Sequence, residues 1–407
     1  MHVVIIGGGA AGMAAAIAAA KRGRRVTVLE RGRKVLKKLG VTGNGRGNLL
    51  NRGDAQYFGD ADFAKAVLRN MPYERIAAFL EEAGIPLVHE AEGRMYPSSY
   101  LAASAVDALK WQADALGVEI VVNTRAVRIQ KTAKGFCVHA ARTVFAPDIT
   151  LKSGRVKPGE AIGEEACSFA CDRVIVAAGG AAAPVHGTDG SAYGLLTEHG
   201  HTVTPLRPAL SALTANQKAV EGLNGQRVKA KLTLRSPDGA LLHTSEGEAL
   251  FAEDGVSGIA AMQLARFAYD GCVLHMDLRL AVTGDENADV SAWLKRRMQT
   301  RDQRTLLTGA ASPALANALW RRAGQNVDKL AEVIADFTVP LTGVRGFDSA
   351  QVTAGGVKTA DFDPATMQSR LVPGLYAAGE VLDVDGACGG FNLMFAFACG
   401  LLAGGAE

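Results

Sequence analysis

The chain has 407 residues, of which 48% are hydrophobic and 21% charged, with 47 glycines and 13 prolines. This composition excludes a disordered or repetitive protein, and the length exceeds what one hydrophobic core usually supports, so we expect more than one domain. The formal net charge of +3 is too small to indicate a nucleic-acid partner, and it leaves the oligomeric state open.

No apolar stretch reaches the roughly 20 residues that cross a bilayer, so no membrane span is expected. The apolar segment Val3–Ala20 lacks a basic leader and contains a glycine-rich turn, which is not typical of a signal peptide. Six cysteines occur without Cys-x-x-Cys pairs or histidines at metal-ligand spacing, which favours reduced thiols and no metal site. We therefore expect a cytoplasmic protein.

The first 30 residues predict a strand, a helix and a second strand. Val3–Ile6 is β-branched, and the glycine-rich turn after it opens an alanine-rich helix that continues to about Lys21. Arg25–Leu29 is again apolar and β-branched. This βαβ unit predicts an α/β domain of the Rossmann type.

The turn within this unit, Gly7-x-Gly9-x-x-Gly12, is typical of a dinucleotide-binding site. Gly7 permits the tight turn, Gly9 lets the backbone approach a pyrophosphate, and Gly12 allows close helix packing. Glu30 ends the second strand, where an acid binds the adenosine ribose and would repel the 2′-phosphate of NADP. These features leave FAD and NAD open. The contacts expected here are Gly7, Gly9, Ala10, Ala11, Gly12, Glu30 and Arg31.

Further strands and a helix continue the domain. A helix is expected over Leu101–Leu116, a strand over Val118–Val122, and paired strands over Arg125–Gln130 and Phe136–Ala140. Val127, on the first paired strand, is included among the expected cofactor contacts. The polar stretch 141–170 is interpreted as a surface excursion without an assigned structure. A buried strand follows at 173–177 and ends in Gly-Gly.

The pattern changes after about residue 187. Alternating segments such as Val228–Leu234 and Ala240–Thr244 predict strands, and Ser291–Thr300 and Ser312–Ala323 have helical periodicity. We interpret the chain as a dinucleotide-binding domain over 1–186 and 351–407, an inserted β-rich domain over 187–278 and 335–350, and a helical subdomain over 279–334.

Two later segments resemble FAD motifs of the glutathione-reductase-like flavoproteins. Leu375–Glu380 resembles the distal motif, in which an acid binds the ribitol hydroxyls, although Glu380 replaces the commoner Asp. Val174–Gly180 resembles the central strand, with Ala178 where Thr is usual. Gly386–Leu393 leads into a final helix, about Asn392–Leu402, whose N-terminus would face the flavin pyrimidine. The resemblance implies FAD contacts at Ala178, Gly179, Gly180, Gly379, Glu380, Gly389, Gly390, Phe391, Asn392 and Leu393.

The whole chain resembles the BaiN-type family of bacterial FAD-dependent oxidoreductases, also labelled the aminoacetone-oxidase family. The resemblance rests on Leu39–Asn48, Gly93–Pro97, Gly247–Phe251 with Gly255–Gly258, Val352–Val357 and the Gly-Gly-Phe-Asn turn. It implies a split FAD domain interrupted by a β-barrel-like domain and a helical piece. Where the family usually has Cys after Gly-x-Gly-Arg, this chain has Gly47, so no thiol chemistry is expected there.

The loop Thr42–Asn48 is expected to lie against the isoalloxazine, with contacts at Asn44, Arg46, Gly47 and Asn48. Arg46, together with Asn44, is the catalytic candidate, because a guanidinium can stabilise anionic reduced flavin or orient an acidic or carbonyl substrate. An arginine that merely pairs with a phosphate or a surface acid explains the same residue.

There is no second Gly-x-Gly-x-x-Gly motif, so NADH or NADPH would be a transient co-substrate at the open flavin face. We expect an enzyme that carries out two-electron redox chemistry through FAD on a small organic substrate, an enone or an amine. A tRNA-modifying flavoprotein and a noncatalytic flavin-based redox sensor are the alternatives.

Overall fold

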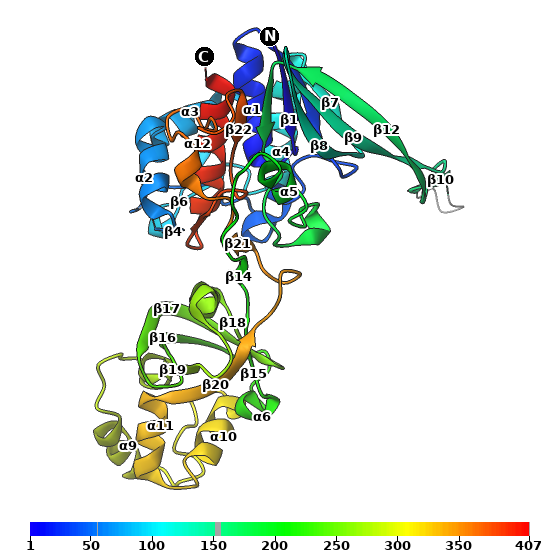
Figure 1. Ribbon diagram of the computed structural model, residues 1–407. Helices are drawn as coiled ribbons and strands as arrows, with labels where there is room; N and C mark the ends of the chain where they lie inside the picture. Colours follow the sequence, from blue (N-terminus) through cyan, green and yellow to red (C-terminus); the bar gives the residue numbers. More distant parts are fainter. Residues whose placement is uncertain (55, 151–155, 407) are drawn as a thin grey trace. The chain divides into compact units, whose positions relative to one another are not determined.

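The computed structural model describes residues 1–54, 56–150 and 156–406, and the chain forms two compact units (Figure 1). The first unit consists of Met1–Leu206 and Thr353–Glu407, and the second of Arg207–Val352. The sequence placed the first boundary at residue 186. Residues 187–206 instead belong to the first unit, because helix α5 (Tyr193–Thr197) buries Tyr193, Leu195 and Leu196 in its core.

A five-stranded parallel sheet forms the centre of the first unit, in the spatial order β22-β13-β1-β2-β7. All five strands are short. Four of them are largely buried, since parallel strands are covered on both faces, and the edge strand β7 is partly exposed. The order reverses direction at β1, which makes the gap between β1 and β13 the switch point of the fold. Their bounds are β1 (His2–Ile6), β2 (Arg25–Leu29), β7 (Glu119–Val121), β13 (Arg173–Val176) and β22 (Leu375–Ala377).

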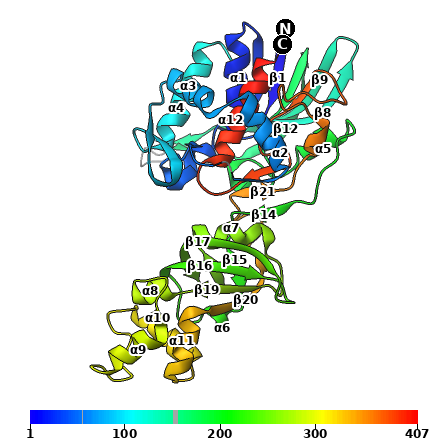
Figure 2. The same ribbon diagram turned by 90° about the vertical axis from the view of Figure 1, so that its left-hand side faces the viewer.

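Helices α1 (Ala10–Lys21) and α12 (Phe391–Gly405) pack on one face of this sheet. The three-stranded sheet of β8 (Thr124–Thr132), β9 (Gly135–Phe145) and β12 (Ala161–Cys171) covers the other face (Figure 2). The domain is therefore a three-layer Rossmann-like fold, as the sequence predicted. The other helices of the unit are α2 (Ala61–Asn70), α3 (Tyr73–Glu82) and α4 (Ala102–Ala115).

The unassigned stretch 141–170 is largely a continuation of the paired strands. β9 and β12 pair from Cys171 with Phe136 to Ala161 with Phe145, and β10 (Ile149–Thr150) pairs with β11 (Val156–Lys157). Residues 151–155 of this stretch lie outside the described residues. Alternation in this stretch is weak because much of β12 is exposed on both faces, which explains why its sequence pattern gave no strand.

Short elements complete the first unit. β3 (Leu50–Asn51), β6 (Arg94–Pro97) and β5 (Leu87–His89) form one small sheet, and β4 (Tyr57–Gly59) pairs with β23 (Val384–Gly386). The 3₁₀ turns are Leu39–Gly45, Ala91–Gly93, Pro184–His186 and Thr359–Asp361. Strands β14 (Arg207–Ala209) and β21 (Val352–Ala354) pair where the chain passes between the units.

The second unit is a closed barrel with helices. Strand β16 alternates between inward Val228, Leu232 and Leu234 and outward lysines, which is the period-two pattern of a strand with one buried face. Phe251 and Phe337 meet edge to face at 5.8 Å inside the unit. The barrel strands are β15 (Leu213–Ala215), β18 (Gly255–Ser257), β17 (Leu241–Ala252), β16 (Arg227–Arg235), β19 (Val273–Asp277) and β20 (Phe337–Val344).

The helices of the second unit share one hydrophobic core with the barrel, so the expected helical subdomain 279–334 is not separated from it. Side-chain caps start four of them: Asn216, Asp289, Ser312 and Asn326 each accept a hydrogen bond from a backbone N–H of the first turn. The helices are α6 (Gln217–Val220), α7 (Ile259–Leu264), α8 (Arg279–Thr283), α9 (Val290–Met298), α10 (Pro313–Arg322) and α11 (Val327–Ala335), with a 3₁₀ turn at Ala265–Phe267. Among the described residues, none of the helices has the length and apolar character that crossing a membrane requires.

Helices α1 and α12 pack so closely that glycine is required between them. A Cβ on Gly400 would collide with the carbonyl of Ala11, and one on Gly404 with the carbonyl of Ala15. Both contacts advance in the same direction along the two helices, so the helices are parallel. Because Gly400 lies level with Ala11, α12 has already run for eight residues at the level where α1 begins. The two helix starts are therefore offset by about 12 Å along the common axis.

Replacing Gly404 by Ala is expected to lower the free energy of unfolding by about 1–3 kcal/mol, because the backbone of α1 cannot move away without disturbing the sheet. Gly405→Ala is the matched control, since no atom lies within 4 Å of its added Cβ and Ala is the better helix former. Urea unfolding followed by circular dichroism measures the difference. Equal stability of the two variants would contradict this packing.

Candidate functional site

The carboxyl ends of four neighbouring strands lie at one edge of the central sheet, which is where ligands bind in folds of this kind. The backbone joins these ends in order: the N–H of Gly7 donates to Leu29 at 2.8 Å, that of Ala177 to Ile6 at 2.8 Å, and that of Ala378 to Val176 at 2.9 Å. Segments from the two ends of the chain therefore meet at one edge, as the sequence predicted.

The glycine turn after β1 has the features of a phosphate site. Gly7 has φ +102°, and a Cβ there would lie 2.6 Å from the carbonyl oxygen of Ala177. A Cβ on Gly12 would collide with the carbonyl of Gly7, whereas nothing lies within 4 Å of one on Gly9. No side chain caps Gly9 and no acid lies in the first turn of α1. The helix start therefore presents its N–H groups, through Ala10 and Ala11, to open space that fits a pyrophosphate.

Glu30 is held in place by backbone donors. The N–H of Gly8 donates to Oε2 at 2.9 Å and that of Gly32 to Oε1 at 2.7 Å, and the side chain is almost fully buried. Each oxygen keeps a lone pair for a ribose hydroxyl. Val127 lies in a bulge between the paired residues of β8 and β9 and is half exposed, which leaves its backbone outside the ladder.

Arg31 has a protein partner that the sequence pattern did not indicate. Its guanidinium lies 2.5 Å from Oδ1 of Asp189, and Ser191 donates to the same carboxylate oxygen at 2.6 Å. Burial by itself raises the pKa of Asp189, but the hydrogen bonds from Arg31 and Ser191 outweigh burial and lower the pKa to about 2. The structure therefore gives Arg31 a part in fixing the segment that follows the Gly179-Gly180 turn.

The depressed pKa of Asp189 predicts a pH-dependent contribution to stability. The charged carboxylate stabilises the fold above the pKa of an unfolded Asp, about 3.9, and this stabilisation is lost as the pH falls towards 2. Asp189→Asn is therefore expected to lower the melting temperature near neutral pH and to match the parent below about pH 3. Thermal unfolding at several pH values measures this. A difference that stays constant down to about pH 2 would contradict the role of the charge.

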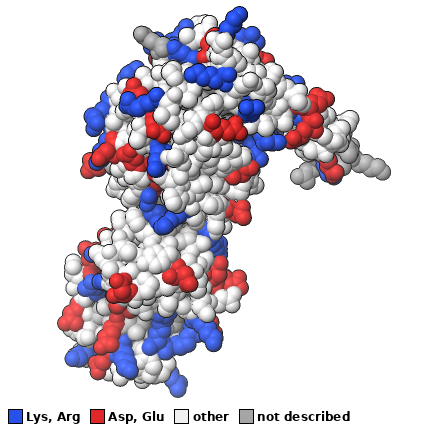
Figure 3. All heavy atoms as spheres, viewed as in Figure 1, with Lys and Arg blue, Asp and Glu red and all other residues white. Residues whose placement is uncertain are grey.

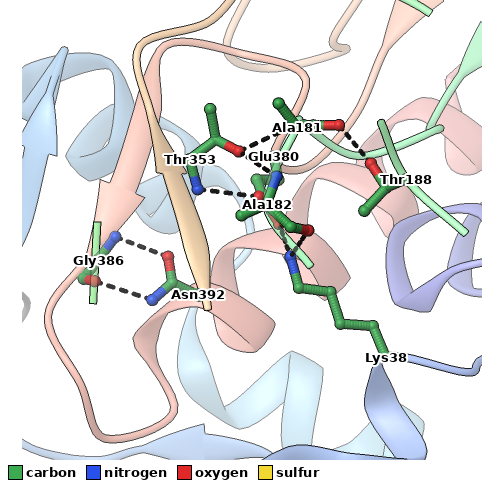
Figure 4. A network of polar contacts seen from close by, with 9 residues as sticks. Lys38, Ala181, Ala182, Thr188, Thr353, Glu380, Gly386 and Asn392 are labelled. Carbon is green, nitrogen blue, oxygen red and sulfur yellow. Dashed lines mark hydrogen bonds and ion pairs between the residues drawn. The ribbon is translucent and has the colours of Figure 1, made fainter. Parts of the chain in front are cut away.

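Glu380 is the centre of a polar network (Figure 4). Its Oε2 lies 2.7 Å from Nζ of Lys38, and its Oε1 accepts from the N–H of Thr353 at 3.0 Å. Oγ1 of Thr353 in turn accepts from the N–H groups of Ala181 and Ala182 at 2.8 and 2.9 Å. Glu380 thus orders the turn after β13, and a ribitol hydroxyl would use the remaining lone pairs of its carboxylate.

The same network fixes the glycines beside it. A Cβ on Gly180 would lie 2.9 Å from Oε1 of Glu380, and Thr188 donates to the carbonyl of Gly180. Gly379 has φ +79°, and its added Cβ would lie 2.9 Å from the Cβ of Ala11 in α1. Ala178 is buried. The central and distal motifs therefore lie directly against the phosphate turn.

The turn before α12 is held by Asn392. Its amide accepts from the N–H of Gly386 at 2.8 Å and donates to the carbonyl of Gly386 at 2.8 Å, so the predicted cofactor contact has a structural task. The hydroxyl of Tyr57 donates to the carbonyl of Phe391 at 2.9 Å. Gly389 and Gly390 have φ of +133° and +103°, and Leu393 is half-buried one residue beyond Asn392.

Asn48 has an unpartnered polar atom at the start of α12. Its Oδ1 is buried without a hydrogen-bond partner among the described residues, and a Cβ on Gly390 would lie 2.8 Å from it. No side chain caps α12, and no acid lies in its first turn. Two uncapped helix starts, offset by about 12 Å, thus suit the two ends of an extended ribityl phosphate. These residues fit FAD.

Arg46 is fixed by three partners. Its NH2 lies 2.6 Å from Oε1 of Glu90, and its guanidinium lies over the rings of Tyr96 at 4.6 Å and Tyr100 at 4.8 Å. The hydrogen bond to Glu90 raises the pKa of Arg46 further. The side chain is still 47% exposed, so part of its donor edge faces solvent. Arg46 pairs with an acid, which agrees with a structural role, and it keeps free donors, which agrees with a role in catalysis.

The rest of the loop places Arg46 next to Asn48. A Cβ on Gly43 would lie 3.0 Å from the N of Asn48 and 3.5 Å from a ring carbon of Tyr96. Gly47 is buried against Ala102 with φ +79°, which explains a glycine in place of a cysteine. Asn44 has φ +55° and is exposed. The loop thus connects the Arg46 cluster to the expected flavin pyrimidine position, and Asn44 contributes to its shape.

Sequence reasoning missed the partners that come from elsewhere in the chain. Lys38 and Glu90 were not among the expected site residues. Thr353 and Tyr96 belong to segments that carried the family resemblance, but no role followed from it. Among the described residues, no group of three or more His, Cys, Asp or Glu is arranged to hold a metal ion.

Comparison with known proteins agrees with this geometry. Residues 1–406 match the family model described as the HI0933-like protein Rossmann domain. The chain belongs to this family. This membership confirms the expected BaiN-type resemblance and the Rossmann-like fold. It also confirms that the protein is an FAD-dependent oxidoreductase.

Curated relatives match over nearly the full length, including the second unit. A 3-dehydro-bile acid delta(4,6)-reductase of Clostridium scindens is 33% identical over 99% of this chain and 98% of its own. A ribosomal RNA dihydrouridine synthase of Escherichia coli is 26% identical over 97% of this chain and 94% of its own. A protein of the same name from Haemophilus influenzae is 27% identical over 98% of this chain and 97% of its own.

Substitution of two glycines in the phosphate turn distinguishes an effect on cofactor binding from an effect on protein stability. Gly9→Ala adds a Cβ to open space at φ −78°, so we expect unchanged stability of the FAD-free protein but at least about tenfold weaker FAD binding. Gly7→Ala forces a side chain onto φ +102° against Ala177 and is expected to destabilise the protein itself. Flavin fluorescence titration and thermal unfolding measure the two effects. Undiminished FAD affinity in Gly9→Ala would place the pyrophosphate elsewhere.

Proposed function

We propose that this protein uses FAD to reduce the carbon–carbon double bond of an α,β-unsaturated carbonyl in a small organic molecule. The observation that carries the proposal is Arg46, held by Glu90 and two tyrosine rings with free donors beside the expected flavin position. Bound FAD supplies the two electrons as a hydride. The name of the bile-acid relative, a reductase acting on conjugated positions, supports this class.

Arg46 serves the reaction by binding the carbonyl oxygen of the substrate. Negative charge develops on that oxygen when a hydride adds to the β-carbon, and a guanidinium already fixed in place stabilises it without reorganisation. A proton from solvent at the α-carbon completes the reduction. Burial and the hydrogen bond to Glu90 raise the pKa of Tyr100, whose hydroxyl thus helps to hold the carboxylate that orients Arg46. Tyr100 has φ +53°, a strained conformation that positions this side chain.

The same arginine favours an enone over an amine among the two expected substrate classes. A protonated amine and the guanidinium carry like charges and repel each other in a partly desolvated site. NADH or NADPH as a transient reductant belongs to the proposal. Glu30 is expected to bind the adenosine ribose of FAD, so a nicotinamide donor would use the flavin face and not this pocket.

A second candidate is reduction of uridine in RNA, favoured by the names of the two ribosomal RNA dihydrouridine synthases. The C5–C6 double bond of uracil is conjugated to a carbonyl, so Arg46 would serve the same purpose. These relatives are less similar to this chain than the reductase is. The names of the relatives support neither the tRNA-modifying alternative nor a noncatalytic sensor.

Arg46→Gln is expected to lower kcat/KM for an enone about 100-fold, with little change in FAD binding. Anaerobic mixing of the NADH- or NADPH-reduced enzyme with a cyclic enone, an amine and uridine-containing RNA measures flavin reoxidation. Arg52→Gln is the matched control, because Arg52 lies over the ring of Tyr73 at the surface of the same unit. Reoxidation by none of the acceptors, or equal activity of Arg46→Gln and the parent, would sink the proposal.

A further inference from the structure

The hydroxyl of Tyr193 is buried without a hydrogen-bond partner among the described residues, and the whole side chain is only 7% exposed. Such a hydroxyl has given up its hydrogen bonds to water without replacement, which lowers the stability of the fold. Exposed charge is a poorer guide to a ligand, because Lys and Arg side chains lie among Asp and Glu side chains on both units in Figure 3. The unpartnered oxygen therefore indicates where a ligand would complete the structure.

Backbone hydrogen bonds hold Tyr193 against the turn that follows β13. The N–H of Gly190 donates to the carbonyl of Gly180 at 2.9 Å, and the N–H of Tyr193 donates to the carbonyl of Gly190 at 3.2 Å. A Cβ on Gly190 would lie 3.6 Å from two carbons of the tyrosine ring. Gly180 in turn lies against Glu380, since its added Cβ would lie 2.9 Å from Oε1. The ring of Tyr193 thus lies on the segment that the Glu380 network orders.

Two carboxylates lie near the hydroxyl of Tyr193. Burial, together with the negative charges of Glu380 and Asp383, raises the pKa of Tyr193 well above its ordinary value, so the hydroxyl stays protonated and can donate. The oxygens of Glu380 have other partners: Oε2 lies 2.7 Å from Nζ of Lys38, and Oε1 accepts from the N–H of Thr353. The hydroxyl is therefore close enough to Glu380 to feel its charge, but it does not bond to it.

A ligand hydroxyl is the group that suits the space between Tyr193 and Glu380. It has one proton and two lone pairs, so it can accept from the tyrosine and donate to the carboxylate at the same time. A phosphate oxygen is disfavoured, because its negative charge would be repelled by Glu380 and Asp383. An apolar group would leave the tyrosine without a partner. The chemistry of this position is that of a neutral polyol chain.

We propose that Tyr193 binds the ribityl chain of FAD by donating a hydrogen bond to one of its hydroxyl groups, which in turn donates to Glu380. Tyr193 begins α5, in the segment that the sequence pattern assigned to the inserted domain, so no motif indicated it. The contact gives residues 187–206 a part in holding the cofactor. The inference rests on the binding of FAD and does not depend on the proposed reduction.

Tyr193→Phe in the full-length protein removes the hydroxyl and keeps the ring. We expect this variant to bind FAD about three- to tenfold more weakly, as the loss of one neutral hydrogen bond predicts. It is expected to bind ADP, which lacks the ribityl chain, like the parent. The melting temperature of its FAD-free form should equal or exceed that of the parent, because the hydroxyl has no partner there to lose. Flavin fluorescence titration, calorimetric titration with ADP and thermal unfolding measure the three quantities.

Tyr376→Phe is the matched control. Tyr376 is 1% exposed, and its hydroxyl donates to Oε1 of Gln368 at 3.1 Å, so this hydroxyl is already satisfied within the protein. The control is expected to lower the melting temperature of the FAD-free protein and to leave FAD affinity unchanged.

Three results would overturn the proposal. The first is an FAD affinity of Tyr193→Phe equal to that of the parent. The second is an equal weakening of FAD and ADP binding, which would place the contact on the adenosine diphosphate half of the cofactor. The third is a melting temperature of FAD-free Tyr193→Phe lowered as in the control, which would show that the hydroxyl already has a partner. All these measurements are made without a substrate, so failure of enone reduction would leave them unaffected.

Discussion

The close contact between α1 and α12 is the constraint on which the first unit depends. The two helices come from opposite ends of the chain, and they approach until Gly400 and Gly404 touch the backbone of α1. That approach sets the level at which each helix begins, and hence where two sets of unpaired N–H groups lie. Parallel pairing of β22 with β13 adds a second link between the chain ends. The cofactor site is thus a product of long-range packing rather than of any single motif.

Much of this arrangement could be predicted from the sequence because it depends on local patterns. Strand β2 occupies the residues expected for it, helix α1 ends at Lys21 as expected, and helices α4 and α12 begin within one residue of expectation. A glycine turn between a strand and a helix has few conformations, so its position and purpose follow from residue spacing alone. The split of the sheet followed from an apolar strand near the C-terminus that ends in Gly379 and Glu380.

Side-chain partners could not be predicted, because they depend on register and packing between distant segments. Glu380 was expected to reach a ribitol, yet it also meets Lys38, 342 positions away, and Thr353. Arg31 lies beside Asp189 only because residues 187–206 fold back onto the first unit. Arg46 drew attention as a charged residue in a glycine-rich loop, but Glu90 and the tyrosines that orient it gave no pattern. The domain boundary was missed for the same reason, since a five-residue helix is too short for periodicity to reveal.

The way the second unit is attached has a consequence for how this architecture diversifies. The chain leaves at β14 and returns at β21, two strands that pair with each other, and the N–H of Thr204 donates to the carbonyl of Gly356 at 2.9 Å just outside them. The two attachment points are therefore adjacent, and a short linker would close the gap if residues 207–352 were excised. Insertion at such a point leaves the host fold intact. Recombination can thus exchange the guest segment as a cassette.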